Sequence, residues 1–535
     1  MRFVSIETEY SQGLQTSSNM PISQDSQLLP RATSNPFTRV AQALTNTRVL
    51  WILFSVLVVL VWGPRMFRSF WVDEAGTFWM AHEGFFSAIR KTWNWPGQSV
   101  LYSGIASLFC FSSGPLREFA LRIPSVLGMA IAGYYLYKLT ESAIGPGSGL
   151  VALILMAFHP DIVPLGTEAR PYGLGIGSVA ASCWYLYQYT ETANRKYVVR
   201  FVFASLAVIY MHYLFGVIFL AQAGYLLYLF ITNRRSVRWA ELLAGYAAIA
   251  LLSLPLVEHI RLLMREAHTL PLAFFPTVRD LVDRLISPFL VFGLLLSALA
   301  IQFGLPDGWR SPAVAKRSVL ILGLGWWLIP PVLFFALSIK TPMRLFVPRY
   351  FSYSILAQVL LFVSLAYSVL RSRVAQTWAM LGVLLSTASP LSIAAARARG
   401  SEELKPSLDI IRSENSKGTP PPILFSSPLP ETNFEDWPAG ALGSHAYAPF
   451  VAYPVPNRIL LLPYRFTDEV KQHVAELLRT QLRDKPEILF MAHQVLAESW
   501  ESWILQTMKD AGYTATVEHP NVYYVILFRR AANRS

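Results

Sequence analysis

The chain has 535 residues, of which 53% are hydrophobic and only 15% are charged, and its mean hydropathy is +0.39. A soluble protein carries about 25% charged residues, so this composition excludes an ordinary soluble enzyme and indicates a polytopic membrane protein. The net charge of +12 would also suit nucleic acid. In a membrane protein, however, basic residues concentrate in cytoplasmic loops, and we expect no nucleic-acid partner.

The N-terminal 47 residues are rich in Ser, Thr, Gln and Asn, and the first apolar run begins only near residue 49. A signal peptide places its apolar region closer to the first methionine, so we predict a disordered cytoplasmic tail over 1–47. A transmembrane catalytic domain is predicted over 48–395. The fold class is mainly α, a polytopic bundle of about 11 spans. The predicted spans lie near 49–66, 119–138, 149–165, 171–189, 197–213, 214–231, 240–257, 281–303, 319–338, 350–370 and 376–394.

Basic clusters follow the fourth, sixth, eighth and tenth predicted spans, and they set the direction in which the chain crosses the membrane. They place the N-terminus in the cytoplasm and the C-terminal part outside, in a multi-pass protein of the plasma (inner) membrane. The apolar run 99–111 would break this alternation if it crossed the bilayer. We therefore predict that it lies in the interface, as a helix of the first outer loop.

Residues 396–535 differ in character and are predicted to form a small extracytoplasmic α/β domain. Pro and Ser cluster over 406–438. Short apolar strands then alternate with amphipathic helices, with strands predicted at 458–463, 487–493 and 521–530 and helices at 467–482 and 499–513. The domain has no glycine pattern for phosphate binding, and we interpret it as a packing or acceptor-recruiting module.

Two adjacent carboxylates, Asp73 and Glu74, follow the first predicted span in the sequence WVDEAGTFW. An ordinary solvated loop explains such a pair equally well. The functional hypothesis is a catalytic pair in which Asp73 is the general base that takes a proton from an attacking hydroxyl. Flanking aromatic residues would partly desolvate it and raise its proton affinity. A divalent cation could bind the two carboxylates. Two residues supply few of the oxygen ligands that such an ion needs, so no metal or other cofactor is assigned.

More polar residues gather at the outer ends of later spans, in the sequences EARPY, MHY and VPRYF. An arginine there commonly extends to lipid phosphates, and a lone histidine commonly makes an interfacial hydrogen bond. The functional hypothesis gives Arg170 and Arg349 the phosphate of a lipid-linked donor, because the guanidinium fork suits phosphate oxygens. The residues expected to contact substrate are Glu168, Tyr172, His212, Tyr213 and Tyr350.

The ordered set DEA, EARPY, HY and PRY resembles the multi-spanning C-type glycosyltransferases, above all the protein O-mannosyltransferase-like and lipid A aminoarabinose transferase-like branches. The resemblance covers roughly 49–395. It implies inverting transfer of a sugar from a polyprenyl-phosphate donor, on the outer leaflet, to a hydroxyl of a glycan, lipid or protein. By this resemblance Asp73 aligns with the catalytic acidic residue, Glu168 with a second acidic position, and Arg170 and Arg349 with donor-phosphate contacts.

One stretch departs from the family pattern. Many relatives carry a His-Pro-Pro-like motif after the acidic loop, whereas this chain reads NWPGQS over 94–99. The departure leaves the acceptor class and any metal role there open.

A membrane transporter or flippase for a lipid-linked or anionic substrate is the main alternative, and a non-catalytic membrane scaffold is a third. Transporters bury ionisable residues at the membrane midplane and often show inverted repeats. Here the charged residues gather at the outer ends of the predicted helices, and the sequence shows no internal repeat. The sequence pattern therefore favours the enzyme.

Overall fold

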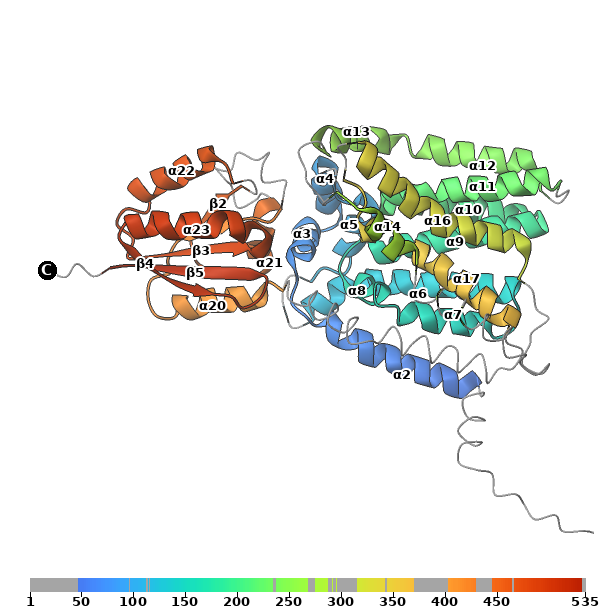
Figure 1. The fold of residues 1–535 in the computed structure, drawn as a ribbon, viewed down its shortest axis with the longest axis horizontal. Helices are drawn as coiled ribbons and strands as arrows, with labels where there is room; N and C mark the ends of the chain where they lie inside the picture. Colours follow the sequence, from blue (N-terminus) through green and yellow to red (C-terminus); the bar gives the residue numbers. More distant parts are fainter. Residues whose placement is uncertain are drawn as a thin grey trace, which may run out of the picture.

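The computed structural model describes residues 47–95, 97–111, 114, 116–233, 237–267, 275–286, 291, 295, 315–341, 344–369, 403–429, 445–463 and 466–531. These residues form a helical bundle with a smaller α/β unit at one end (Figure 1). The predicted tail over 1–47, apart from its last residue, and the predicted span 376–394 lie outside the described residues. Of the predicted span 281–303, only 281–286, 291 and 295 are described.

The bundle is built from helices of different lengths. The long or apolar ones are α2 (Thr47–Met66), α6 (Arg117–Ala143), α7 (Ser148–Ala157), α8 (Ile162–Thr167), α9 (Tyr172–Thr192), α10 (Arg195–Met211), α11 (Ile218–Ile231), α12 (Trp239–Leu252), α16 (Arg317–Lys340) and α17 (Ser354–Val369). Shorter helices at the end nearest the α/β unit are α3 (Val72–Ala81), α4 (Phe85–Asn94), α5 (Val100–Ser107) and α13 (Pro255–Ala267), and a further short helix is α14 (Val278–Leu285). Two 3₁₀-helices, η1 (Tyr213–Val217) and η3 (Pro348–Tyr350), precede α11 and α17.

Among the described residues, three helices are long and apolar enough to cross a membrane, or four if the bent pair α12 and α13 counts as one span. The three are α6, α16 and the continuous segment formed by η1 and α11. The mainly helical fold is thus confirmed, while the expected number of about 11 spans stays a prediction. The run 99–111 holds only the short helix α5, which is too short to span a bilayer of about 30 Å at 1.5 Å per residue.

Two predicted spans are broken in the structure, which corrects the expectation of continuous helices. The segment 149–165 divides into α7 and α8 near Pro160, whose ring removes a backbone hydrogen-bond donor. The segment 240–257 divides before Pro255, and the axes of α12 and α13 differ by 61°. Proline therefore explains both breaks, and the second one starts an amphipathic helix near the polar end of the bundle.

Helices α6 and α9 are held in close contact by glycines. A Cβ atom added to Gly128 would lie 2.2 Å from the backbone nitrogen of Leu174, and one added to Gly173 would lie 2.4 Å from the carbonyl oxygen of Ser125. Only glycine permits such an approach of two backbones. This contact fixes the start of α9 against α6, and Arg170 lies in the turn just before α9.

The α/β unit contains a five-stranded sheet in the order β2-β1-β3-β5-β4. Strands β1 and β2, and β1 and β3, are parallel, whereas β5 runs antiparallel to both β3 and β4. The elements are α20 (Lys405–Asn415), β1 (Ile423–Ser426), η6 (His445–Tyr447), α21 (Ala448–Ala452), β2 (Ile459–Leu462), α22 (Asp468–Arg479), β3 (Glu487–His493), α23 (Gln494–Asp510), β4 (Tyr513–Glu518) and β5 (Tyr523–Arg530). The α/β character expected here is present, although α20, β1 and β4 were not predicted.

Both faces of this sheet are covered. On strand β3, Ile488 and Phe490 pack in one apolar cluster with Trp500 of α23, while Leu489 packs in another cluster with Leu408 of α20. Alternate residues of a strand point to opposite faces, which explains the division. Figure 1 accordingly shows α22 and α23 on one face of the sheet and α20 on the other.

The α/β unit is joined to the bundle by a continuous apolar cluster that includes Phe70, Phe78 and Tyr453. Hydrogen bonds reinforce the contact. The backbone N–H of Leu404 donates to the carbonyl of Phe70 at 3.0 Å, and the Tyr453 hydroxyl donates to Glu118 at 2.9 Å while it accepts from the Phe70 N–H at 2.7 Å. The α/β unit therefore rests on the segment that leads into α3.

Candidate active site

Helix α3 carries both predicted carboxylates. Asp73 and Glu74 lie in its first turn, where acidic side chains interact favourably with the positive end of the helix dipole. Consecutive helical residues point about 100° apart, so the two side chains cannot share one direction. The alternative of an ordinary solvated loop is therefore wrong for this position, where a helical turn separates the pair.

Glu74 is buried and binds Arg122 of α6. Its two carboxylate oxygens accept hydrogen bonds from Nε and Nη2 of Arg122 at 2.7 and 2.6 Å, and the Ala169 N–H donates to the same carboxylate at 2.7 Å. The side chain of Glu74 is 1% exposed and that of Arg122 is 3% exposed. Arg122 also donates to carbonyl oxygens at the end of α2 and just after it, those of Arg65, Met66, Arg68 and Ser69.

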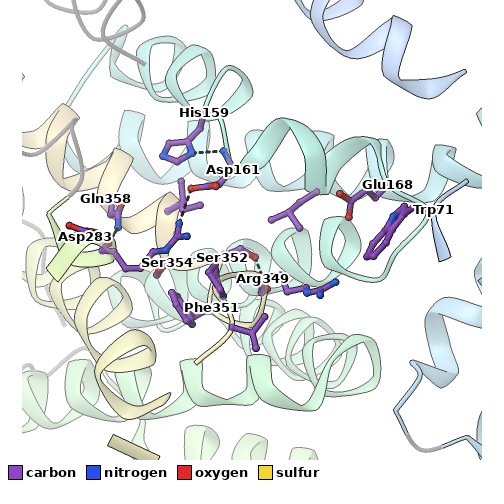
Figure 2. A pocket seen from close by; sticks show the side chains of 15 residues that line it. Trp71, His159, Asp161, Glu168, Asp283, Arg349, Phe351, Ser352, Ser354 and Gln358 are labelled. Carbon is purple, nitrogen blue, oxygen red and sulfur yellow. Dashed lines mark hydrogen bonds and ion pairs between the residues drawn. The ribbon is translucent and has the colours of Figure 1, made fainter. Parts of the chain in front are cut away.

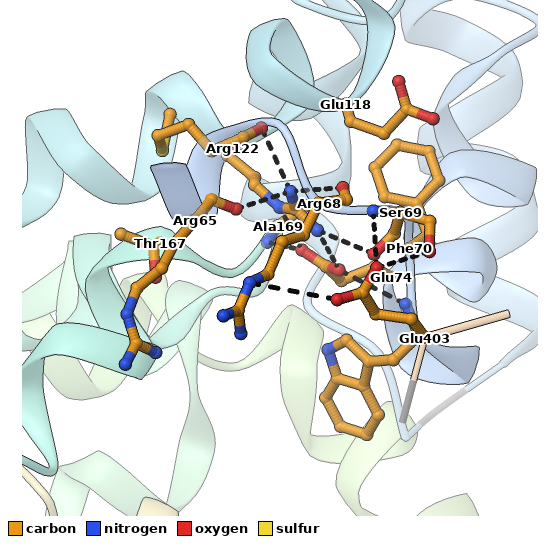
Figure 3. A network of polar contacts seen from close by, with 12 residues as sticks. Arg65, Arg68, Ser69, Phe70, Glu74, Glu118, Arg122, Thr167, Ala169 and Glu403 are labelled. Atoms are coloured by element: carbon orange, nitrogen blue, oxygen red, sulfur yellow. Dashed lines mark hydrogen bonds and ion pairs between the residues drawn. The ribbon is translucent and has the colours of Figure 1, made fainter. Parts of the chain in front are cut away.

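Figure 3 shows this network as a junction of four segments: the end of α2, helix α3, helix α6 and the turn before α9. The catalytic role predicted for Glu74 stays a prediction, and its contacts are those of a residue that positions its neighbours. A buried carboxylate with a buried guanidinium partner holds the first turn of α3 in place, and with it the direction of Asp73.

Asp73 instead faces two other arginines. Its Oδ2 atom lies 3.1 Å from Nη1 of Arg349 and 3.7 Å from Nη2 of Arg170. The carboxylate is 22% exposed, so it remains open on one side. The three residues come from α3, from the turn before α9 and from η3. The structure thus brings together the predicted base and the two predicted phosphate contacts.

Arg170 is held in a defined orientation. Its Nη1 atom donates to the carbonyl oxygen of Asp73 at 3.3 Å and to the side chain of Gln98 at 3.2 Å. The Ser125 hydroxyl of α6 donates to the carbonyl of Arg170 at 2.9 Å. Arg170 is 8% exposed, and among the described residues its Nε atom has no hydrogen-bond partner. Gln98 belongs to the NWPGQS stretch, so this departure from the family pattern contributes directly to the site.

Arg349 is more open than Arg170. It lies in η3, directly before α17, and its side chain is 38% exposed. Its guanidinium group is 5.6 Å from the ring centre of Trp71, a distance at which cation–π attraction operates. The Ser352 hydroxyl donates to its carbonyl oxygen at 3.0 Å. The side chain of Arg349 can therefore turn toward a ligand, whereas the side chain of Arg170 is already held in place.

The exposed side of Arg349 opens into a cavity of about 360 Å³ (Figure 2). Trp71 and Glu168 line it beside Arg349, and Asp161 and Arg284 line it farther away. A volume of this size falls in the range of small-molecule sites, which is about 300–1,000 Å³. Glu168, predicted to contact substrate, thus lines the same cavity as the predicted phosphate contact.

The four remaining predicted contacts lie beside the site in an aromatic group. The His212 ring lies 4.8 Å from Phe215, 5.5 Å from Tyr172 and 5.3 Å from Tyr350, measured between ring centres. Tyr213 hydrogen bonds to Nδ1 of His259 and to the Gln98 carbonyl. Tyr172 is buried and the other three are partly buried, and the roles of all four in substrate binding stay predictions.

His445 is a residue near the site that the sequence did not reveal. It comes from η6 of the α/β unit, and its ring packs against Trp79 and Trp95 with centre distances of 5.4 and 5.2 Å. Burial, together with the charge of Arg170, lowers its pKa to about 4. Among the described residues neither ring nitrogen has a hydrogen-bond partner. No sequence signal marks this histidine, because only the docking of the α/β unit brings it to α3.

Arg122 is the other missed residue, and a signal for it did exist. It is an arginine within an apolar run predicted to span the membrane, and such residues are rare and usually paired. Its position did not reveal that Glu74 would be the partner.

The structure also contains no group of three or more His, Cys, Asp or Glu side chains arranged to hold a metal ion, within the part of the chain that it describes.

Comparison with known proteins addresses the family. Residues 98–258 match the family model described as dolichyl-phosphate-mannose-protein mannosyltransferase. The crystal structure of ArnT from Cupriavidus metallidurans bound to undecaprenyl phosphate aligns with a TM-score of 0.51 and 12% sequence identity, over 91% of this chain and 99% of that chain. The chain has the C-type glycosyltransferase fold. The resemblance seen in the sequence motifs is thereby confirmed.

Two further comparisons complete this result. The apo form of ArnT from Cupriavidus metallidurans aligns with a TM-score of 0.42 and 9% identity, over 90% of this chain and 98% of that chain, and adds no argument. No curated protein matches the chain. The matched family segment begins at Gln98 and ends at Glu258 in α13, so it includes Arg122, Glu168 and Arg170 of this C-type glycosyltransferase fold.

Proposed function

We propose that this protein is an integral-membrane glycosyltransferase that moves a sugar from a polyprenyl-phosphate donor to an acceptor hydroxyl on the outer face of the membrane, with inversion. The family match and the fold support a membrane glycosyltransferase. One observation carries the finer proposal. The Asp73 carboxylate lies between the guanidinium groups of Arg170 and Arg349, at 3.7 and 3.1 Å, beside a cavity that Arg349 lines.

The two arginines suit the leaving group. When the bond between the anomeric carbon and the phosphate oxygen breaks, its electron pair goes to the phosphate, which gains negative charge. Fixed cations placed where charge develops lower the barrier for such a step. Arg170, which is oriented by Asp73 and Gln98, and Arg349, which is open to the cavity, would bind the departing polyprenyl phosphate.

Asp73 suits the other half of the reaction. The acceptor hydroxyl gives its proton to the carboxylate as its oxygen attacks the anomeric carbon on the face opposite the phosphate. This single displacement inverts the anomeric configuration. The donor phosphate would compete with Asp73 for Arg349 and Arg170, because a phosphate and a carboxylate bind guanidinium groups through the same N–H donors. Donor binding would therefore weaken the ion pairs of Asp73 and leave its carboxylate free to accept a hydrogen bond from the acceptor hydroxyl.

Transfer from labelled donors tests the proposal. Purified protein would be given undecaprenyl-phosphoryl mannose, glucose or aminoarabinose, each labelled in the sugar, together with a detergent extract of cell envelopes. We expect release of undecaprenyl phosphate and movement of label into the extract for at least one donor. A flippase would instead move intact donor between leaflets of a vesicle. Translocation without cleavage of any donor would contradict the enzyme and support the transporter.

A further inference from the structure

The cavity beside Arg349 has a second polar end that the proposed reaction does not use. Figure 2 shows Trp71, Glu168 and Arg349 at one end and His159 and Asp161 at the other. The proposed phosphate contacts lie only at the first end. A cavity of about 360 Å³ therefore extends from Arg349 to a separate set of polar side chains.

The second end is assembled from three segments of the chain. Asp161 lies between α7 and α8, Arg284 lies in the last turn of α14, and Gln358 lies in the second turn of α17. Nη1 of Arg284 is 3.4 Å from Oδ2 of Asp161, and the Gln358 amide donates to the Arg284 carbonyl at 3.1 Å. We call these three residues the distal subsite.

The distal subsite is held in place by a hydrogen bond, and two of its side chains remain accessible from the cavity. Gln358 is 5% exposed and holds the backbone of Arg284. The side chains of Asp161 and Arg284 are 30% and 37% exposed, so both retain surface toward the cavity that they line. Apolar side chains, including Leu165, complete the lining. Sites for small polar molecules commonly combine an apolar lining with a few placed polar groups.

The chemistry of the distal subsite favours one part of the donor. A hydrocarbon tail there would take water from the Asp161–Arg284 ion pair without replacing its hydrogen bonds, which is costly. A phosphate would meet carboxylates, since Asp283 lines the cavity as well as Asp161. Sugar hydroxyls, in contrast, both donate and accept hydrogen bonds, and they suit a carboxylate beside a guanidinium group.

We propose that the distal subsite binds the sugar of the donor through its hydroxyl groups and selects sugars without a negative charge. This inference rests on the proposed function, because the donor phosphate must lie at the Arg349 end of the cavity. With the phosphate there, the sugar occupies the rest of the cavity. Asp161 and Arg284 then act as specificity-determining residues, and Asp161 with Asp283 repels a uronic acid.

Two ligands that differ only in the sugar test this inference. Undecaprenyl phosphate carries the tail and the phosphate, and an undecaprenyl-phosphoryl sugar carries the sugar in addition. Binding of both would be measured for the wild type, Asp161→Asn and Gln358→Leu, with a sugar donor that is cleaved in the transfer assay. Glu191→Gln is the matched control, because it alters a comparable, partly exposed ion pair with Lys316 at 3.1 Å that does not line the cavity. Thermal unfolding would verify that each variant folds.

We expect the Asp161 and Gln358 variants to bind the sugar donor about 5- to 100-fold more weakly, the range for losing one or two hydrogen bonds of which one is charged. Undecaprenyl phosphate should bind within about twofold of the wild type, and the control should bind both ligands normally. Undecaprenyl-phosphoryl glucuronate should bind the wild type more weakly than the neutral donors and should gain affinity in Asp161→Asn.

Three results would overturn the inference. Equal losses for both ligands would place the tail or the phosphate at the distal subsite. Unchanged binding of the sugar donor by both variants would show that the sugar lies elsewhere. Failure of the folded wild type to bind undecaprenyl phosphate would overturn the proposed function and this inference with it, and that failure is distinguishable because it does not involve the variants.

Discussion

Glu74→Gln should destabilise the protein far more than Asp73→Asn, although the two carboxylates are neighbours. Glu74 is 1% exposed and accepts two hydrogen bonds from Arg122, which is 3% exposed. A neutral glutamine leaves the Arg122 charge buried without a counter-charge. Removing one partner of such a pair costs about 3–5 kcal/mol. A domain is stable by only about 5–15 kcal/mol, so this is a large fraction of the total.

The ion pair of Asp73 with Arg349 is more exposed, so its loss should destabilise the protein less. Asp73 is 22% exposed and its partner Arg349 is 38% exposed, so solvent screens their attraction. Loss of an exposed pair changes the free energy of unfolding by about 1 kcal/mol or less. Thermal unfolding in detergent should therefore show a fall of several degrees for Glu74→Gln. Asp73→Asn should show a smaller fall, because it removes the exposed pair with Arg349 and the longer, 3.7 Å contact with the buried Arg170.

A double variant separates burial of charge from loss of packing. The cost of losing one partner comes from the charge that stays buried without a counter-charge, so removing that charge as well should relieve it. Glu74→Gln combined with Arg122→Met should therefore unfold closer to the wild type than Glu74→Gln alone. A melting temperature of Glu74→Gln equal to that of the wild type would refute the reasoning, because Arg122 would then tolerate burial without its partner.

Three further predictions follow from the site, its domain contact and the direction of the chain. Arg170→Lys should lower both donor binding and turnover by at least about tenfold, because lysine cannot reproduce the planar fork, and a wild-type rate would contradict the phosphate contact. Gly76→Ala should loosen the α/β unit, because its Cβ atom would lie 2.7 Å from Nε2 of His445; limited proteolysis would report this, and unchanged resistance would count against the contact. In a cysteine-free background, Thr480→Cys should react with an impermeant reagent on intact cells and Thr192→Cys only after permeabilisation, whereas the reverse pattern would invert the proposed orientation.

The convergence of Asp73, Arg170 and Arg349 could be predicted from the sequence. Each residue follows or precedes an apolar run, and the alternation of basic clusters placed all three at the same ends of the helices. Helix ends on one side of a bundle can meet even when they are hundreds of residues apart along the chain. The spacing of the charged residues and the lengths of the apolar segments are therefore enough to predict that these three residues converge.

The sequence could not predict that Glu74 is buried against Arg122 while Asp73 stays partly exposed beside Arg349. The adjacency of Asp73 and Glu74 says nothing about which one turns toward the bundle, and only the position of Arg122 in the fold decides it. The strand β1 was missed because its four residues follow a proline-rich segment and carry no alternation. Helix α20 was missed because Pro406 and nearby serines suggested a loop, although proline is well tolerated in the first turn of a helix.

The role of His445 depends on tertiary contact alone. The histidine is separated from α3 by hundreds of residues, and its local sequence, SHAYAP, has no periodicity that indicates an interface. Its ring reaches Trp79 and Trp95 only because the apolar cluster around Tyr453 docks the α/β unit on the bundle. Sequence patterns predict elements and their ends, whereas a contact of this kind requires the assembled fold.

Single-turnover sugar transfer by Asp73→Asn tests the central claim most directly. The protein would be saturated with a labelled undecaprenyl-phosphoryl sugar, mixed with acceptor extract, and sampled for released undecaprenyl phosphate, with binding of undecaprenyl phosphate measured separately. The account predicts a transfer rate lower by about 10²- to 10⁴-fold, the usual contribution of a general base. Binding should be unchanged or tighter, because Arg349 and Arg170 lose a competing carboxylate. Transfer at the wild-type rate in folded Asp73→Asn would contradict the assignment of Asp73 as the base.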